Sequence, residues 1–134
     1  MKRSFLLLGM LLLLLAACGG EDAASNNAGV LGPVPTEYAG VTNPYGSEAL
    51  TEGGKLFESF CVSCHGKYGH GDGVAGASLD PKPKNLAELQ AQVTDDYLFW
   101  RISTGKPGTS MVAWNGILTE DQIWQIVVYI RALK

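Results

Sequence analysis

The sequence has few residues of the kinds that bind metals or form cross-links. Its 134 residues include three cysteines, two histidines and three methionines. Two cysteines form a C-x-x-C pair, but no second Cys or His pair is present to complete the four ligands of a zinc site. A thioredoxin-like dithiol would require a strand–helix–strand pattern around the pair, and no such pattern is present. Both classes of site are therefore disfavoured.

The chain also lacks a membrane-spanning run and an excess of positive charge. Its apolar run over residues 5–15 is shorter than the about 20 residues that a spanning helix needs. The 10 basic residues against 13 acidic ones give a net charge of −3, which becomes −5 if Lys2 and Arg3 are removed with an N-terminal signal. No basic patch predicts nucleic-acid binding, and steering toward a strongly acidic docking site is not expected.

The chain is organised around a C-x-x-C-H sequence formed by Cys61, Cys64 and His65. This pattern attaches a c-type haem, because the two thiols add across the porphyrin vinyl groups and the spacer sets the sulfur separation. The adjacent histidine then ligates the iron from the proximal side. A structural disulfide would leave His65 unexplained. The sequence therefore predicts one covalently bound haem c.

Residues 64–73 read CHGKYGHGDG, which resembles the C-H-G-x-x-G-x-G-D-G run of bacterial class I cytochromes c. The resemblance extends over residues 46–134 and implies a cytochrome c domain that carries electrons and is not itself an enzyme. It implies an all-α fold, with three to four helices wrapped around the haem. About 89 residues are few for an apolar core, so we expect the haem to supply buried surface and the apoprotein to fold poorly.

The N-terminus has the features of a bacterial lipoprotein. Lys2 and Arg3 precede the apolar run, and Leu15-Ala16-Ala17-Cys18-Gly19 resembles a lipobox. We predict a signal peptide over residues 1–17, a lipidated Cys18, and export to the outer (periplasmic) face of the cell membrane. An ordinary cleavage site beside a chance cysteine is the alternative. With one cysteine lipidated and two bound to haem, none remains for a disulfide.

Residues 18–45 are predicted to be a lipid-anchored flexible linker, because Gly, Ala, Asn, Ser and Pro dominate. The linker could serve only for spacing, or residues 38–45 could pack along a partner subunit.

Helical patterns begin after this stretch. The first predicted helix covers residues 47–60, with Ser47 as N-cap. The family resemblance implies that its Gly53 and Gly54 let Tyr129 approach closely, and a merely weakened helix is the alternative. The chain from 66 to 93 is mostly loop, with a short helix over 86–93. Further helices are predicted from Thr94 or the next residue to 104, and from a T-x-x-Q capping box at 119 to about 133.

Residues 106–114 resemble the distal loop of the cytochrome c family, which usually ends in Met-Pro-Ala-Trp. Met111 is the predicted sixth iron ligand, and it is the only methionine left once the signal is removed. Val112 stands where the family usually has proline, which weakens loop rigidity without excluding ligation. His70 would have to cross the porphyrin to reach the distal face, so we expect an exposed loop histidine.

Other predicted haem contacts are weaker. In the family, a carbonyl of a proline segment accepts a hydrogen bond from the proximal histidine, and Pro83 is the candidate here, with Pro81 close behind. Tyr97, Arg101 and Trp114 are candidates for binding the haem propionates. Pro83 could equally be an ordinary loop proline, and Arg101 a solvated surface charge.

An iron with His and Met ligands has no open coordination position, so it exchanges one electron. Both thioether ligation and a low-dielectric pocket raise the reduction potential. We expect a membrane-tethered carrier between a quinol-oxidising complex and a terminal oxidase or photosynthetic reaction centre, with no small-molecule substrate. A fixed subunit of a larger complex is the alternative, since the lipobox, tether and single domain resemble the monohaem subunit of alternative complex III. Two alternatives belong to other functional classes: a haem sensor or catalytic domain with a labile Met111, and a domain that only scaffolds a complex.

Overall fold

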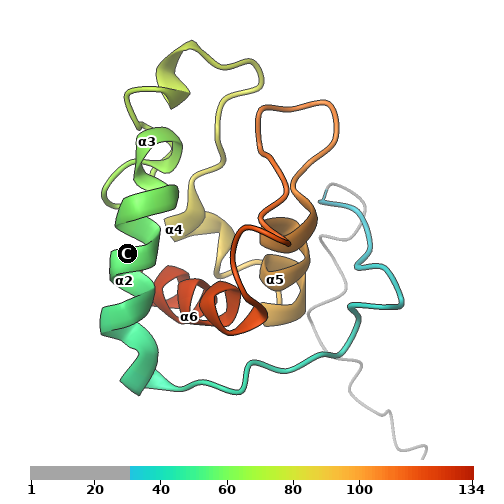
Figure 1. The fold of residues 1–134 in the computed structure, drawn as a ribbon. Coiled ribbons are helices and arrows are strands. Elements are labelled where there is room, and N and C mark those ends of the chain that lie inside the picture. Colours follow the sequence, from blue (N-terminus) through green and yellow to red (C-terminus); the bar gives the residue numbers. More distant parts are fainter. Residues whose placement is uncertain (1–30) are drawn as a thin grey trace, which may run out of the picture.

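The computed structural model describes residues 31–134, and all regular elements in this part of the chain are helices (Figure 1). The predicted all-α fold is confirmed, with five α-helices in the described residues where three to four were expected. The signal peptide, Cys18 and the first part of the predicted linker lie outside the described residues. No helix of residues 31–134 has the length and apolar character needed to cross a lipid bilayer. The elements, in chain order, are the 3-10 helix η2 (Ser47–Ala49), α2 (Leu50–Phe60), α3 (Val62–His65), the 3-10 helix η3 (Gly76–Ser78), α4 (Leu86–Leu89), α5 (Asp95–Thr104) and α6 (Glu120–Arg131).

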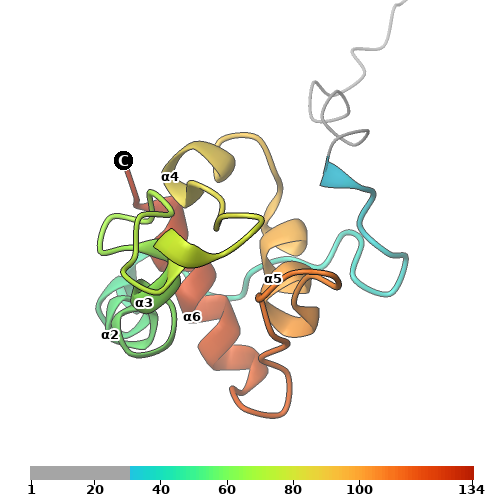
Figure 2. The ribbon, with the colours of Figure 1, turned by 90° about the horizontal axis from the view of Figure 1, so that it is seen from above.

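Helices α2 and α6 cross and form the main packing contact of the domain (Figures 1 and 2). Glycine permits this close approach. A Cβ atom at Gly53 would overlap the carbonyl oxygen of Gln125, and one at Gly54 would lie 3.1 Å from the ring of Tyr129. The predicted approach of Tyr129 to the two glycines is therefore confirmed.

The last helix forms as its sequence predicts. Thr119 and Gln122 make the reciprocal capping box, in which the Thr119 hydroxyl accepts from the Gln122 amide at 3.2 Å and the Gln122 side chain accepts from the Thr119 amide at 2.9 Å. Helix α5 packs on α6 through the stacked rings of Phe99 and Trp124, whose centroids are 4.0 Å apart. The α6 side chains at helical spacing are all buried, namely Ile123, Trp124, Ile126, Val127 and Ile130.

Two predicted helix starts differ in detail. Ser47 is not an N-cap: it begins η2, and the Gly46 amide donates instead to the side chain of Glu48 at 2.7 Å. Thr94 does occupy the N-cap position of α5, but its hydroxyl bonds to the Asp96 carboxylate and no side-chain cap forms. In the first case the Glu48 carboxylate accepts from the Gly46 amide, and in the second the Asp96 carboxylate accepts from the Thr94 hydroxyl. The predicted helix over 86–93 is confined to α4.

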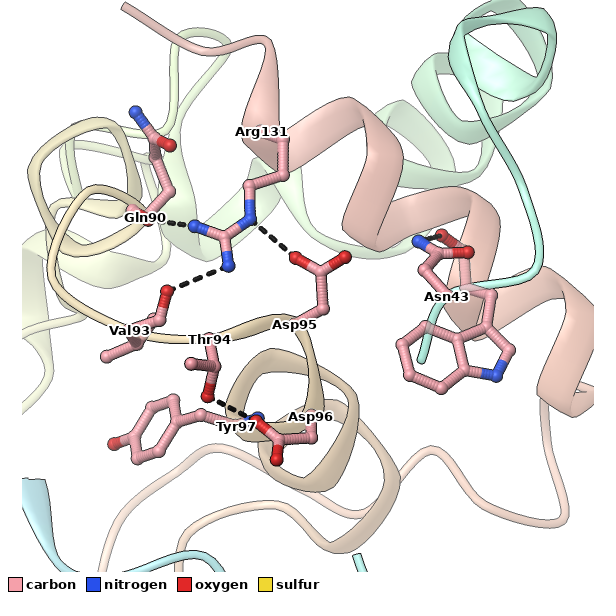
Figure 3. A network of polar contacts seen from close by, with 9 residues as sticks. Asn43, Gln90, Val93, Thr94, Asp95, Asp96, Tyr97 and Arg131 are labelled. Atoms are coloured by element: carbon pink, nitrogen blue, oxygen red, sulfur yellow. Dashed lines mark hydrogen bonds and ion pairs between the residues drawn. The ribbon is translucent and has the colours of Figure 1, made fainter. Parts of the chain in front are cut away.

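Residues 31–45 lie against the folded domain, although their composition predicted a flexible linker. The Gly40 amide donates to Asp96 at 2.8 Å. The Asn43 side chain donates to the carbonyl of Trp124 at 3.1 Å (Figure 3). The ring of Tyr38 lies 6.2 Å from that of Phe99. These two polar contacts and one aromatic contact are specific, and composition alone does not reveal them. We call residues 31–45 the strap.

Arg131 ties the end of α6 to the segment before α5 (Figure 3). Its guanidinium donates to the Asp95 carboxylate at 2.7 Å, to the carbonyl of Val93 at 2.8 Å, and to the carbonyl of Gln90. All three nitrogens are therefore used, which fixes the irregular chain between α4 and α5.

Candidate haem-binding site

The C-x-x-C-H residues form one compact helical turn at the end of α2. The Cys61 amide still donates to Phe57 at 2.8 Å, and the chain then turns into α3, where the His65 amide donates to the carbonyl of Cys61 at 2.9 Å. Both thiols are unpaired and partly buried. Burial, with a smaller contribution from Cys64, raises the pKa of the Cys61 thiol to about 12. The turn thus presents two thiols and one imidazole together.

The imidazole of His65 is oriented by a main-chain carbonyl. Its Nδ1 lies 3.3 Å from the carbonyl oxygen of Lys84. A carbonyl can only accept a hydrogen bond, so Nδ1 carries the proton in this contact and Nε2 keeps its lone pair. Burial lowers the pKa of His65, and the Lys84 bond opposes this shift in part. The neutral imidazole is the form that ligates iron.

The predicted carbonyl acceptor is corrected by one residue, from Pro83 to Lys84. The reason lies in the packing of Pro83 itself. Its carbonyl oxygen faces the backbone of Gly71, and its ring packs at Gly76, where a Cβ would lie 2.9 Å from Pro83 Cγ. The following carbonyl is therefore the one that turns toward the histidine. The proline segment still supplies the support that was expected.

The glycine-rich loop after the motif folds back onto it. Its amides at Gly71, Gly73 and Ala75 donate to the carbonyls of the motif residues His65, Cys64 and Ser63 at 2.8, 3.2 and 2.9 Å respectively. Side chains would not fit here, since a Cβ at Gly73 would overlap the carbonyl oxygen of Ser63. The glycines are therefore needed because the loop backbone lies directly against the haem-attachment turn.

Met111 lies in the loop between α5 and α6, which lies across the domain from α3 in both views (Figures 1 and 2). The side chain is partly buried and packs against the apolar core. The loop is fixed to α5, because the Trp114 amide donates to the carbonyl of Ile102 at 3.1 Å. The structure thus places Met111 on a fixed loop, and its ligation of iron stays a prediction.

The predicted propionate-binding residues make other contacts in the structure. Tyr97 Oη and the Arg101 guanidinium both donate to the carbonyl of Leu31, at 3.4 and 3.3 Å, and the guanidinium lies 3.7 Å from the ring centroid of Trp100. Both therefore hold the beginning of the strap. The indole of Trp114 packs edge-on against Phe60 with centroids 5.4 Å apart. Propionate binding by Tyr97, Arg101 or Trp114 stays a prediction.

His70 is exposed, as expected, and its Nε2 lies 3.4 Å from the carbonyl oxygen of Lys134. Two residues with a direct part in the site were not found from the sequence. The Lys84 carbonyl is a backbone group and leaves no signal in residue types. The Thr109 hydroxyl accepts from the Met111 amide at 3.2 Å. In the sequence, the only signal for this contact is a threonine two residues before the predicted ligand.

The chemistry of these donors fits a covalent haem. The two thiols and the free Nε2 of one imidazole occur on a single turn. Within residues 31–134, no group of three or more His, Cys, Asp or Glu side chains could hold a different metal ion.

Comparison with known families identifies the domain. Residues 48–130 match the family described as cytochrome c oxidase, cbb3-type, subunit III, a family of cytochrome c domains. The chain belongs to this family. It is a c-type cytochrome that carries one covalent haem c, and members of its family are typically electron carriers rather than enzymes. A comparison with curated proteins found no match.

Solved structures of other cytochromes resemble this one. A chain of the Kuenenia stuttgartiensis reducing HAO-like protein complex Kustc0457/Kustc0458 has 31% identity over 69% of the cytochrome, with a TM-score of 0.59; the match spans 44% of that longer chain. The KustC0563 c-type cytochrome has 26% identity over 61% of this chain and 96% of its own, with a TM-score of 0.53. Cytochrome CL from the methylotrophic bacterium Methylophaga aminisulfidivorans has 23% identity over 91% of this chain and 73% of its own, with a TM-score of 0.51. At this identity the match supports the fold alone.

Proposed function

We propose that this cytochrome transfers single electrons through a haem iron held by His65 and Met111. The observation that carries the proposal is the orientation of His65, whose Nδ1 is bound by the Lys84 carbonyl at 3.3 Å so that Nε2 is free beside the two thiols. The bound haem supplies a centre that accepts and releases one electron. With His65 and Met111 as the two side-chain ligands of the iron, no position would be left for a substrate.

The protein's own groups have distinct roles in this proposal. Cys61 and Cys64 hold the haem by thioether bonds, which prevents its loss on each redox cycle. The Lys84 bond raises the basicity of His65 and fixes its ring. Met111 favours the reduced state and a high potential. Of the remaining candidates, Pro83 acts by packing the segment that presents Lys84, while Tyr97, Arg101 and Trp114 are proposed to contact the propionates.

We further propose that the cytochrome is exported and tethered to the outer face of the membrane. Residues 1–17 would be the signal peptide, lipidated Cys18 the anchor, and residues 18–45 the connection to the cytochrome c domain at 46–134. Because each buried CH₂ contributes about 0.8 kcal/mol, several acyl chains would anchor the protein stably. Cell fractionation tests this: the wild type is expected in membranes, whereas Cys18→Ala is expected to leave them. Retention of Cys18→Ala in membranes would refute the lipid anchor.

Two kinds of partner fit this placement. A free carrier would take electrons from a quinol-oxidising complex and pass them to a terminal oxidase or reaction centre. A fixed subunit, as in alternative complex III, would remain bound to one complex, and the resemblance to a chain of a multi-subunit complex supports this second arrangement. Gentle solubilisation separates them, because a fixed subunit copurifies with stoichiometric partners.

The electron-carrier role is tested by potentiometric titration of the purified holoprotein, followed optically. A carrier gives one reversible one-electron transition, and its reduced form does not bind carbon monoxide. A sensor or catalytic haem domain with a labile Met111 would bind carbon monoxide readily in the reduced state. That result would replace the carrier proposal with the sensor or catalyst.

A further inference from the structure

The loop that carries Met111 contains a threonine with two hydrogen bonds from one hydroxyl. Thr109 Oγ1 donates to the carbonyl of Lys106 at 2.8 Å and accepts from the amide of Met111 at 3.2 Å. A hydroxyl can donate and accept at the same time. We propose that Thr109 is a positioning residue that holds Met111 in place for the iron. This inference rests on the proposed ligation by Met111.

The rest of the loop supports the same geometry. The Lys106 amide donates to the carbonyl of Met111 at 3.0 Å, and the Thr109 amide donates to the carbonyl of Lys106 at 3.1 Å. Residues 106–111 therefore form a closed turn in which both backbone polar groups of Met111 are bound. Gly105, with φ +67°, ends α5 beneath this turn, where a Cβ would lie 2.5 Å from the Met111 carbonyl oxygen.

Thr109 compensates for a residue that does not restrain the loop. Val112 is 57% exposed, and it stands where the distal loop that this segment resembles usually has a proline. A proline would restrict the backbone of Met111 directly, because the residue before a proline is confined to extended conformations. A valine imposes no such restriction. The restraint instead comes from Thr109, which precedes Met111 by two residues and whose hydroxyl accepts the hydrogen bond of the Met111 amide.

The consequence concerns the fraction of molecules in which Met111 has left the iron. One hydrogen bond contributes on the order of 1 kcal/mol, so its loss raises that fraction about five- to tenfold. An added ligand that binds only the open form then binds tighter by the same factor, because its apparent affinity scales with the fraction of competent molecules.

The test uses the full-length holoprotein and imidazole as the added ligand for the oxidised iron. Thr109→Val removes the hydroxyl while keeping the shape, and Thr109→Ser keeps the hydroxyl. Thr104→Val is the matched control, because the Thr104 hydroxyl donates to the carbonyls of Trp100 at 2.9 Å and Gly105 at 3.5 Å, whereas the Met111 amide is bound by Thr109. We expect Thr109→Val to bind imidazole about five- to tenfold tighter than the wild type, with Thr109→Ser and Thr104→Val close to the wild type.

Thermal unfolding of each variant separates local release of Met111 from loss of the whole fold. Equal imidazole affinity in Thr109→Val and wild type would overturn the inference, as would a Thr109→Ser variant that behaves like Thr109→Val. If the rise in imidazole affinity is matched by an equal loss in the free energy of unfolding of the whole protein, the inference is also overturned. A wild type without the optical band of an iron–thioether bond would instead refute the proposed Met111 ligation itself.

Discussion

His65 Nδ1 and the carbonyl oxygen of Lys84 lie 3.3 Å apart, across 19 residues of chain. This contact depends on Gly71, which has φ +79° and whose backbone lies against the carbonyl of Pro83. Gly71 also donates its amide to the His65 carbonyl at 2.8 Å, so the orientation of the proximal ligand depends on a glycine that contacts both chain segments joined by this hydrogen bond.

Replacing Gly71 by alanine should displace the segment that presents Lys84. The added Cβ would overlap the carbonyl oxygen of Pro83 and would sit at positive φ, which costs about 1–3 kcal/mol before the overlap is counted. A weaker bond to His65 lowers the basicity of the imidazole, so the reduction potential should rise. Gly40→Ala is the control, because Gly40 has φ +77° and nothing within 4 Å of its Cβ position. Equal unfolding energies and potentials for the two variants would contradict this account.

The crossing of α2 and α6 predicts different costs at neighbouring glycines. Alanine usually stabilises a helix by about 1 kcal/mol relative to glycine. At Gly53 the new Cβ would overlap the Gln125 carbonyl oxygen, which belongs to a backbone that cannot move easily. We expect Gly53→Ala to lose about 1–3 kcal/mol, and Gly54→Ala, which faces only the ring of Tyr129, to lose less. Denaturant unfolding of the holoprotein measures both, and the reverse order would refute this packing.

Arg131 should matter more than an ordinary surface cation. Replacing it by methionine leaves two carbonyls and the Asp95 carboxylate without their donor, which should cost about 1–3 kcal/mol. The control is Lys55→Met, since the Lys55–Glu52 pair is 67% and 53% exposed and such pairs contribute about 0–1 kcal/mol. The difference should appear in urea unfolding. A larger loss for Lys55→Met would contradict the assigned role.

Asp96 should make the strap sensitive to acid. Burial alone would raise its pKa, but hydrogen bonds from Thr94, Gly40 and Tyr97 outweigh burial and hold the pKa below its ordinary value of 3.8. A depressed carboxyl pKa stabilises the folded state above the unfolded pKa, and this contribution is lost as pH falls through the folded pKa. Wild type should therefore exceed Asp96→Asn in stability at neutral pH. The difference should shrink as pH falls below about 3.8 and vanish only once the pH is below the lower pKa of the folded protein. A difference that persists in stronger acid would exclude this cause.

The sequence predicted those parts of the molecule that depend on local pattern. The capping box at Thr119, the end of a helix at residue 104 and the C-x-x-C-H turn at residues 61–65 all involve residues close together in the chain. The predicted approach of Tyr129 to Gly53 and Gly54 spans a long separation, and it came from the family resemblance. The exact proline-segment carbonyl was missed, because backbone acceptors carry no residue signature.

The strap was missed for a related reason. Its composition of glycine, proline and asparagine indicates flexibility, whereas its order comes from individual contacts such as Gly40 with Asp96 and Tyr38 with Phe99. Tyr97 and Arg101 illustrate the same limit. Their residue types fit propionates, and in the structure their polar groups reach the Leu31 carbonyl.

The most direct test of the central claim is the optical spectrum of the membrane-extracted wild type, oxidised and reduced, with and without carbon monoxide. The account predicts a low-spin spectrum, the weak long-wavelength band of an iron–thioether bond in the oxidised form, and no change on adding carbon monoxide to the reduced form. A high-spin spectrum, or one that responds to carbon monoxide, would remove Met111 as a stable ligand and contradict the assignment of this cytochrome as an electron carrier with His65 and Met111 as its iron ligands.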